Sequence, residues 1–273
     1  MVTLNALSAH RCVKSIDDAT QIDLSSVDFV LPGGIVAVAC SARSALERGE
    51  QITVVAPDRD DVARYASRMG LSDVLANCGA ESVLPPVRRH EQGHVLVDCQ
   101  WADDSAVEGL SIMVSDRLWA ASVDAEIIDL VDMSVYEVAD NVRTHAGSGG
   151  GFICAQTYKR GTPEERIEVA LGDTGRGIRA SLEARYSPLD DQDALRLATK
   201  ESVTGLPQER RGLGLHYLAR DIPRVGGRFT LRSGGAYLRV FPGGPYSAQS
   251  EPIVGTLVEI CVPVGGLTKG EHS

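Results

Sequence analysis

Residues 167–178 read IEVALGDTGRGI, and this stretch decides the fold. Ile167 to Leu171 is a short apolar run typical of a strand, and it leads directly into Asp173, Gly175 and Gly177. A carboxylate at a strand end can accept a hydrogen bond from the exocyclic amino group of a purine, and glycines let a ligand approach the backbone closely. The stretch therefore predicts a strand followed by a loop that reads adenine.

The segment before this strand predicts a long helix over about 124–146. Glu137, Asn141 and His145 are spaced i, i+4, i+8, so they share one stripe of that helix. A neighbouring apolar stripe consists of Val131, Val135, Val138 and Val142. This apolar stripe can bury one side of the helix while the polar stripe faces a cleft. Polar residues at this spacing are also common on an ordinary solvated helix surface, so the stripe gains meaning only in combination with the glycine-containing segments of the chain after it.

The segment after the loop predicts a mobile lid and a second glycine turn. Residues 179–211 are polar and broken by Ser187-Pro188 and Pro207, which is typical of a lid and not of one regular element. The sequence RRGLGL at 210–215 then opens a helix that runs toward Arg220, and free N–H groups beside two guanidinium groups suit a phosphate. Strands are expected at 228–232, 236–241 and 255–262.

Four other motif interpretations have weaker support. The residues Gly175-x-Gly177-x-x-Ala180 fit a dinucleotide fingerprint loosely, but Pro188 interrupts the helix that such a site needs. No Walker A sequence occurs, which excludes a P-loop. The sequence HEQGH at 90–94 matches a zinc-protease pattern, yet Pro85-Pro86, Gly93 and the lack of a third ligand favour a solvated loop. His90-Glu91 does not continue into a histidine phosphoacceptor box.

Composition bounds the class of protein. A length of 273 residues with 43% apolar and 23% charged residues is typical of one large or two modest globular domains. Six cysteines without C-x-x-C spacing indicate buried thiols in a reducing compartment. The net charge of −10, with no basic half, argues against nucleic acid as a partner. The longest uncharged run is too short to span a membrane, and no signal peptide is visible, so we expect a cytoplasmic protein with no membrane partner.

The amino-terminal region predicts a small layered α/β domain. Short strands at 20–24, 27–31 and 51–56 alternate with helices at 35–48 and from Asp58 to Gly70, an order that implies parallel pairing. The sequences QIDLSSVDFVLPGGIVAVA (21–39), ALERGEQITVV (45–55) and VARYASRMGLSDVL (62–75) resemble the STAS domain of anti-sigma-factor antagonists. In that family a serine or threonine usually begins the helix after the second strand and accepts phosphate. Here the place holds Pro32-Gly33-Gly34, so the resemblance implies a docking or dimerising scaffold.

The carboxy-terminal region resembles the GHKL ATPase superfamily, which includes gyrase, Hsp90, MutL, histidine kinases and anti-sigma serine kinases. The sequences YEVADNVRTHA (136–146), DTGRGI (173–178), RRGLGL (210–215) and GTLVEICVPV (255–264) are similar to its N box, G1 box, G2 box and final strand. The resemblance implies helices on a mixed, mostly antiparallel sheet, with Asn141 ligating Mg²⁺ and Glu137 as general base. It further implies that ATP is bound by Asn141, His145, Asp173, Gly175, Gly177, Ile178, Arg211, Gly212, Leu213, Gly214 and Thr256.

These patterns together predict an α/β protein with a STAS-like domain at 1–100 and a GHKL-type ATP-binding domain at 101–273, whose motifs lie within 124–264. The motif spacing is closest to anti-sigma serine kinases. We therefore expect an ATP- and Mg²⁺-binding regulatory protein with slow ATP hydrolysis or Ser/Thr phosphotransfer to a partner protein. A homodimer is one assembly that the resemblance allows. The alternatives are a dimerising ATPase like Hsp90 or MutL, and a non-catalytic ATP-binding sensor.

Overall fold

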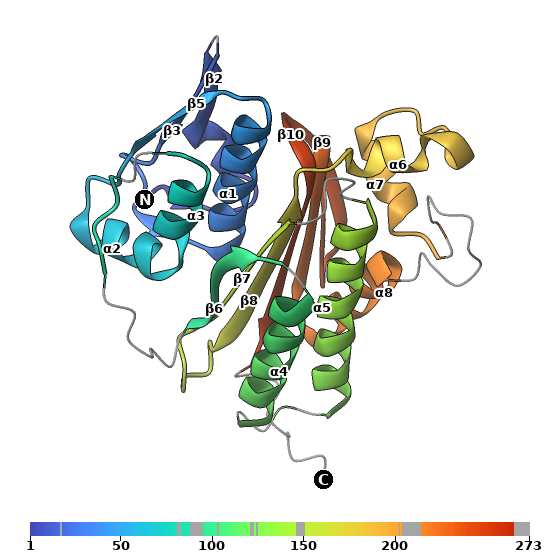
Figure 1. Ribbon diagram of the computed structural model, residues 1–273. Coiled ribbons are helices and arrows are strands. Elements are labelled where there is room, and N and C mark those ends of the chain that lie inside the picture. Colours follow the sequence, from blue (N-terminus) through green and yellow to red (C-terminus); the bar gives the residue numbers. More distant parts are fainter. Residues whose placement is uncertain are drawn as a thin grey trace.

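The protein combines a small amino-terminal α/β unit with a larger antiparallel sheet that is covered by helices (Figure 1). The computed structural model describes residues 1–16, 18–80, 83–87, 95–102, 104–120, 123, 125–145, 151–201, 203 and 214–264. Helices and strands both contribute throughout, so the α/β class is confirmed. No helix among these residues has the length and apolarity that crossing a bilayer requires.

The amino-terminal unit contains the alternating elements that its sequence predicts. Strands β3 (Ala19–Asp23) and β5 (Gln51–Val55) pair in parallel around helix α1 (Pro32–Glu47), and β2 (Val13–Ile16) adds to β3 in antiparallel fashion. A separate parallel pair joins β1 (Thr3–Leu4) to β4 (Phe29–Val30). The remaining elements are the 3₁₀ turn η1 (Ala9–Cys12) and helices α2 (Asp60–Arg68) and α3 (Leu71–Asn77).

Helix α1 starts three residues earlier than the apolar periodicity indicates. Pro32 takes the first helical position, where its missing N–H costs nothing. Gly33 and Gly34 follow inside the helix because neighbours leave no room for side chains. A Cβ at Gly33 would lie 2.5 Å from Oε1 of Glu259, and one at Gly34 would lie 2.5 Å from the carbonyl oxygen of Leu4. The space beside Gly33 is therefore filled by the carboxylate of Glu259, from near the opposite end of the chain.

The large sheet has the strand order β6-β7-β8-β10-β9, and every described neighbour pair is antiparallel. The expected parallel component of a mixed sheet is thus not found among these pairs. The strands expected at 228–232 and 236–241 form one continuous strand, β9, which bends at Gly234 with a positive φ of 57°. The bounds are β6 (Val95–Trp101), β7 (Gly151–Tyr158), β8 (Arg166–Asp173), β9 (Arg228–Phe241) and β10 (Gly244–Pro263).

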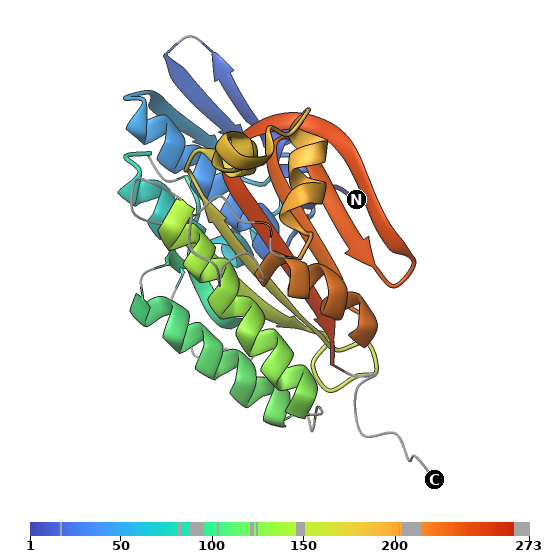
Figure 2. The ribbon, with the colours of Figure 1, turned by 90° about the vertical axis from the view of Figure 1, so that its right-hand side faces the viewer.

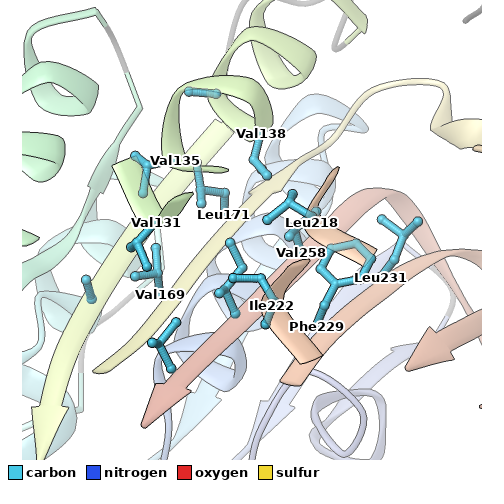
Figure 3. Close-up of a cluster of buried hydrophobic side chains, with 14 of the residues drawn as sticks. Val131, Val135, Val138, Val169, Leu171, Leu218, Ile222, Phe229, Leu231 and Val258 are labelled. Carbon is cyan, nitrogen blue, oxygen red and sulfur yellow. The ribbon is translucent and has the colours of Figure 1, made fainter. Parts of the chain in front are cut away.

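Each face of this sheet packs against a different layer (Figure 2). Helices α4 (Asp104–Ala120), α5 (Ala125–His145) and α8 (Gly214–Asp221) cover one face. Valines of α5 point toward β8 there, and Leu218 of α8 lies beside Phe229 and Val258 (Figure 3). The opposite face packs against α1 and shares a core with the amino-terminal unit; its contributors are Phe152, Cys154, Ala170 and Leu257. The expected boundary between residues 100 and 101 falls inside β6.

The segment expected to be a lid contains two short helices. Helix α6 (Gly177–Tyr186) ends at Ser187, which has a positive φ of 41°, and α7 (Asp191–Ala198) begins after Asp190, whose side chain accepts from the backbone N–H of Asp193. The 3₁₀ turn η2 (Ile222–Val225) leads from α8 into β9. All six cysteines are free and buried, as their spacing indicates.

Candidate functional site

Asp173, the last residue of β8, is a buried carboxylate with spare hydrogen-bonding capacity. Its side chain is only 5% exposed, and Oδ1 accepts a 2.7 Å hydrogen bond from the backbone N–H of Gly175. The backbone of Thr256 on β10 also bonds to this carboxylate. Burial raises the pKa of Asp173 to about 6, although both backbone hydrogen bonds act to lower it. A carboxylate offers about four acceptor positions, so sites remain for a donor from a ligand.

The hydroxyl beside this carboxylate is also without a partner. Oγ1 of Thr174 is buried and makes no hydrogen bond. Buried polar atoms are rarely left unsatisfied, because each one costs about 1–3 kcal/mol. An unused acceptor on Asp173 and an unused hydroxyl on Thr174 thus lie next to each other in the chain.

Two glycines with positive φ let the surrounding backbone close around Asp173. Gly255 has a φ of 72°, and a Cβ there would lie only 2.0 Å from the carbonyl oxygen of Asp173. Gly177 has a φ of 76°, and its Cβ would lie 2.8 Å from Oγ of Ser233. Any larger residue would therefore clash and also strain the backbone. The predicted importance of Gly177 is explained by this close approach, whereas that of Gly255 was not foreseen.

Ser233 joins the two glycine turns and was missed from the sequence. Its hydroxyl accepts a hydrogen bond from the backbone N–H of Ile178 at 3.0 Å and donates to the carbonyl of Gly255 at 2.7 Å. Asp191 of α7 plays a similar part, since its Oδ2 accepts from the backbone N–H of Gly235 at 2.7 Å. The start of α6, the start of α7, the bend in β9 and the end of β8 are therefore fixed relative to one another.

An open depression lies over this junction of turns. It has a volume of about 570 Å³ and is lined by residues of α6, by the bend of β9 and by residues 253–255 of β10. Its lining includes the arginines Arg176 and Arg179 and the carboxylates of Glu183 and Asp191. The depression is thus polar and bears charges of both signs.

Helix α5 carries the predicted catalytic and magnesium-binding residues. Val131, Val135 and Val138 are buried against the sheet, which confirms three of the four members of the apolar stripe; the side chain of Val142 lies outside the described part of the structure (Figure 3). The backbone of Glu137, Asn141 and His145 belongs to α5, but their side chains lie outside the described part of the structure. Helix α5 ends at His145, and Gly151 of β7 pairs with Asp173. The linking residues can span at most about 20 Å, so the carboxyl end of α5 lies toward the end of the sheet that holds Asp173.

The second glycine turn is described only in part. Gly214 is buried and is the first residue of α8, which agrees with the expected helix start. Arg211, Gly212 and Leu213 lie outside the described residues, as does the HEQGH sequence at 90–94. Helix α8 packs against α5 on the same face of the sheet.

The predicted residues thus fall into two groups. Asp173, Gly175, Gly177 and Thr256 come together at the end of β8. Ile178 lies beside them, but its side chain is buried in the apolar core and its N–H is bonded to Ser233, so it contributes packing. The other group is carried by α5 and by the approach to α8. Comparison of the chain with protein-family models, with curated proteins and with solved structures found no match.

Proposed function

We propose that this protein binds ATP with Mg²⁺ at the helix-covered end of β8, and that it uses the nucleotide as a regulatory ATPase or protein serine/threonine kinase. The observation that supports the proposal best is Asp173, a buried carboxylate that is held by backbone N–H groups and retains free acceptor positions. A charged group in such surroundings destabilises the fold, which is typical of residues retained for binding or chemistry.

The roles of the other residues follow from the resemblance to GHKL ATPases. The carboxylate of Asp173 would accept from the adenine amino group, and Thr174 and Thr256 would complete the contact with the ring. The side-chain oxygen of Asn141 suits Mg²⁺, which takes its remaining ligands from phosphate and water. Bound Mg²⁺ would neutralise charge on the triphosphate. The residues 210–215, with Arg211, would close on the phosphates, and His145 would lie near them.

Glu137 is the proposed general base. A carboxylate one turn before Asn141 can orient a water molecule, or the hydroxyl of a partner protein, for in-line attack on the γ-phosphate. The amino-terminal unit offers no acceptor at its STAS-like position, because Gly33 has no room for a side chain beside Glu259. A phosphoryl group would therefore go to water or to a second protein, and the amino-terminal unit would serve for docking.

The adenine contact is tested by comparing ATP with inosine triphosphate, which lacks the exocyclic amino group. Calorimetry should show that the wild-type protein prefers ATP by about 10- to 100-fold, the usual value of a hydrogen bond to a charged group. Asp173→Asn should lose most of this preference, while Glu108→Gln, which changes an exposed carboxylate on α4, should keep it. An equal preference in the wild type and in Asp173→Asn would refute the assignment.

Turnover is tested separately with γ-labelled ATP and cell lysate. Asn141→Ala should abolish Mg²⁺-dependent binding, whereas Glu137→Ala should bind ATP but release no phosphate and label no protein. Release of free phosphate would indicate an ATPase, and transfer to a lysate protein would indicate a kinase. If the wild-type protein binds ATP but neither product forms, the protein is a nucleotide sensor.

A further inference from the structure

A cavity on the opposite side of the sheet separates the amino-terminal unit from β9 and β10. Its volume is about 480 Å³, large enough for a small organic molecule. Helix α1 forms one wall, the strands β2 and β3 with residues around η1 form a second, and residues 251–257 of β10 form a third. Both the small unit and the large sheet are therefore needed to build the cavity.

Arg232 of β9 is the most unusual residue in this wall. Its side chain is fully buried, with 0% of its surface exposed. One terminal nitrogen donates to the carbonyl of Ala6 and the other to the carbonyl of Glu251, both at 2.7 Å. Its Nε has no hydrogen-bond partner, and no carboxylate in the described residues lies within ion-pair distance of the guanidinium. A buried positive charge of this kind is normally paired with an anion.

His10 lines the same cavity and also has a nitrogen without a hydrogen-bond partner. Its Nδ1 is buried and makes no hydrogen bond. Burial, and secondarily the positive charge of Arg232, lowers the pKa of His10, while a backbone hydrogen bond to Leu7 acts to raise it. Nδ1 is the nitrogen left for a ligand, and it donates to an oxyanion when it carries the proton. Two unsatisfied nitrogen-bearing side chains thus line one cavity.

The other polar residues of the wall are largely satisfied. Arg48 forms an ion pair with Glu50, which also accepts from the hydroxyl of Thr20, so these charges cancel. Asp173 and Glu251 contribute the remaining negative charges, and that of Glu251 acts on Arg232. The rest of the surface is apolar and comes from Ala37, Cys40, Ile253 and Leu257. The cavity therefore combines an apolar wall with the neighbouring side chains of Arg232 and His10, and it also holds the carboxylates of Asp173 and Glu251.

We propose that this cavity is a second ligand site, which binds a small organic anion whose oxyanion contacts Arg232 and His10 and whose apolar body packs on α1 and β10. Carboxylates and phosphate esters share the oxyanion, and both accept charge-assisted hydrogen bonds from a guanidinium, of which Nε is the unpartnered nitrogen here. The apolar wall distinguishes such a ligand from a free inorganic ion. Asp173 and Thr256 also line this cavity, so its ligand would share these two residues with the candidate nucleotide site.

The test uses benzoate as the probe, with the full-length protein and saturation-transfer NMR. Benzoate should bind saturably with a Kd of about 1 mM or below, and benzamide, its neutral analogue, should bind at least about tenfold more weakly. Inorganic phosphate that displaces benzoate would show that the oxyanion is the recognised group and would favour phosphate esters. Failure of phosphate to compete would favour carboxylates.

Two variants separate binding from folding. Arg232→Met should reduce benzoate affinity at least about tenfold, while Arg239→Met, which removes a half-buried arginine of the same strand outside the cavity, should not. Because Arg232→Met can also weaken the fold, Ala37→Leu provides a second variant that fills the cavity and keeps every charge. Ala37→Leu should abolish binding in a protein with an unchanged circular dichroism spectrum.

The proposal is overturned if benzoate and benzamide bind equally, if neither binds saturably, or if folded Ala37→Leu retains the affinity of the wild type. ATP affinity is measured on the same samples. Loss of ATP binding with intact benzoate binding would reject the proposed function and leave the second site standing, and the reverse result would reject the second site alone.

Discussion

Replacing Asp173 by Asn should stabilise the protein at neutral pH, although the change lies at the centre of the candidate site. Burial raises the pKa of this carboxyl from 3.8 to about 6. A tenfold change in a proton-binding constant corresponds to about 1.4 kcal/mol, so keeping the group charged in the folded state costs about 3 kcal/mol. Asparagine carries no charge and avoids this cost. Its amide accepts more weakly from Gly175 and Thr256, so the expected net gain is about 1–2 kcal/mol.

The pH dependence gives the prediction its sign. Between pH 3.8 and about 6, Asp173 is more fully protonated in the folded protein than in the unfolded protein. The free energy of unfolding of the wild type therefore falls as the pH rises through this window, and the penalty is fully present above it. Because asparagine does not titrate, the advantage of Asp173→Asn should grow from about pH 4 to about pH 6 and then stay constant.

The assay is urea unfolding of the two proteins in parallel between about pH 4 and pH 8, so that the titration of all other groups cancels in the difference. Glu183→Gln reports what the loss of one surface carboxylate does by itself. A difference that does not change with pH, or an Asp173→Asn variant that is less stable than the wild type near pH 7, would refute the reasoning. Retained preference for ATP in this variant would then count against the binding role as well.

Two further substitutions test the packing of the glycine turns and of α1. Ser233→Ala removes the buried hydroxyl that joins two backbone segments, so it should lower the free energy of unfolding by about 1–3 kcal/mol. Ser247→Ala, whose hydroxyl binds an exposed arginine, should cost less, and equal losses in urea would contradict the role of Ser233. Gly33→Ala should cost about 1–3 kcal/mol in thermal unfolding, because its Cβ would overlap the carboxylate of Glu259. Gly109→Ala, where the Cβ meets nothing, should instead stabilise α4 by up to about 1 kcal/mol, and a Gly33→Ala protein as stable as the wild type would show that the carboxylate can move away.

Much of the fold could be predicted because local signals agree with it. The apolar run that ends at Asp173 forms β8, and the valines spaced along α5 are those buried on the sheet. The sequence does not predict helices α6 and α7, because each is short. The break between them at Ser187 makes the whole segment 179–211 resemble an irregular loop. A capping residue such as Asp190 was the available signal.

Local spacing could predict contacts of the candidate site only between neighbours in the chain, and Thr256 was named beside Asp173 through the family resemblance alone. Asp173 and Gly175 lie two positions apart, and their hydrogen bond could be anticipated from the loop. Ser233 acts on Ile178 from 55 residues away, and Asp191 acts on Gly235 from 44 residues away. Such contacts depend on how β9 and β10 pair, which no local pattern contains. For the same reason, the burial of Arg232 beneath Ala6 could not be predicted.

The shared core behind the sheet limits how the chain can be divided. Phe152, Cys154, Ala170 and Leu257 of the sheet pack directly on side chains of the amino-terminal unit. A fragment that starts after that unit would expose this apolar face to water and would self-associate. Heating should therefore unfold both parts in a single cooperative transition. A ligand or partner that binds the amino-terminal unit would then also change the stability of the sheet.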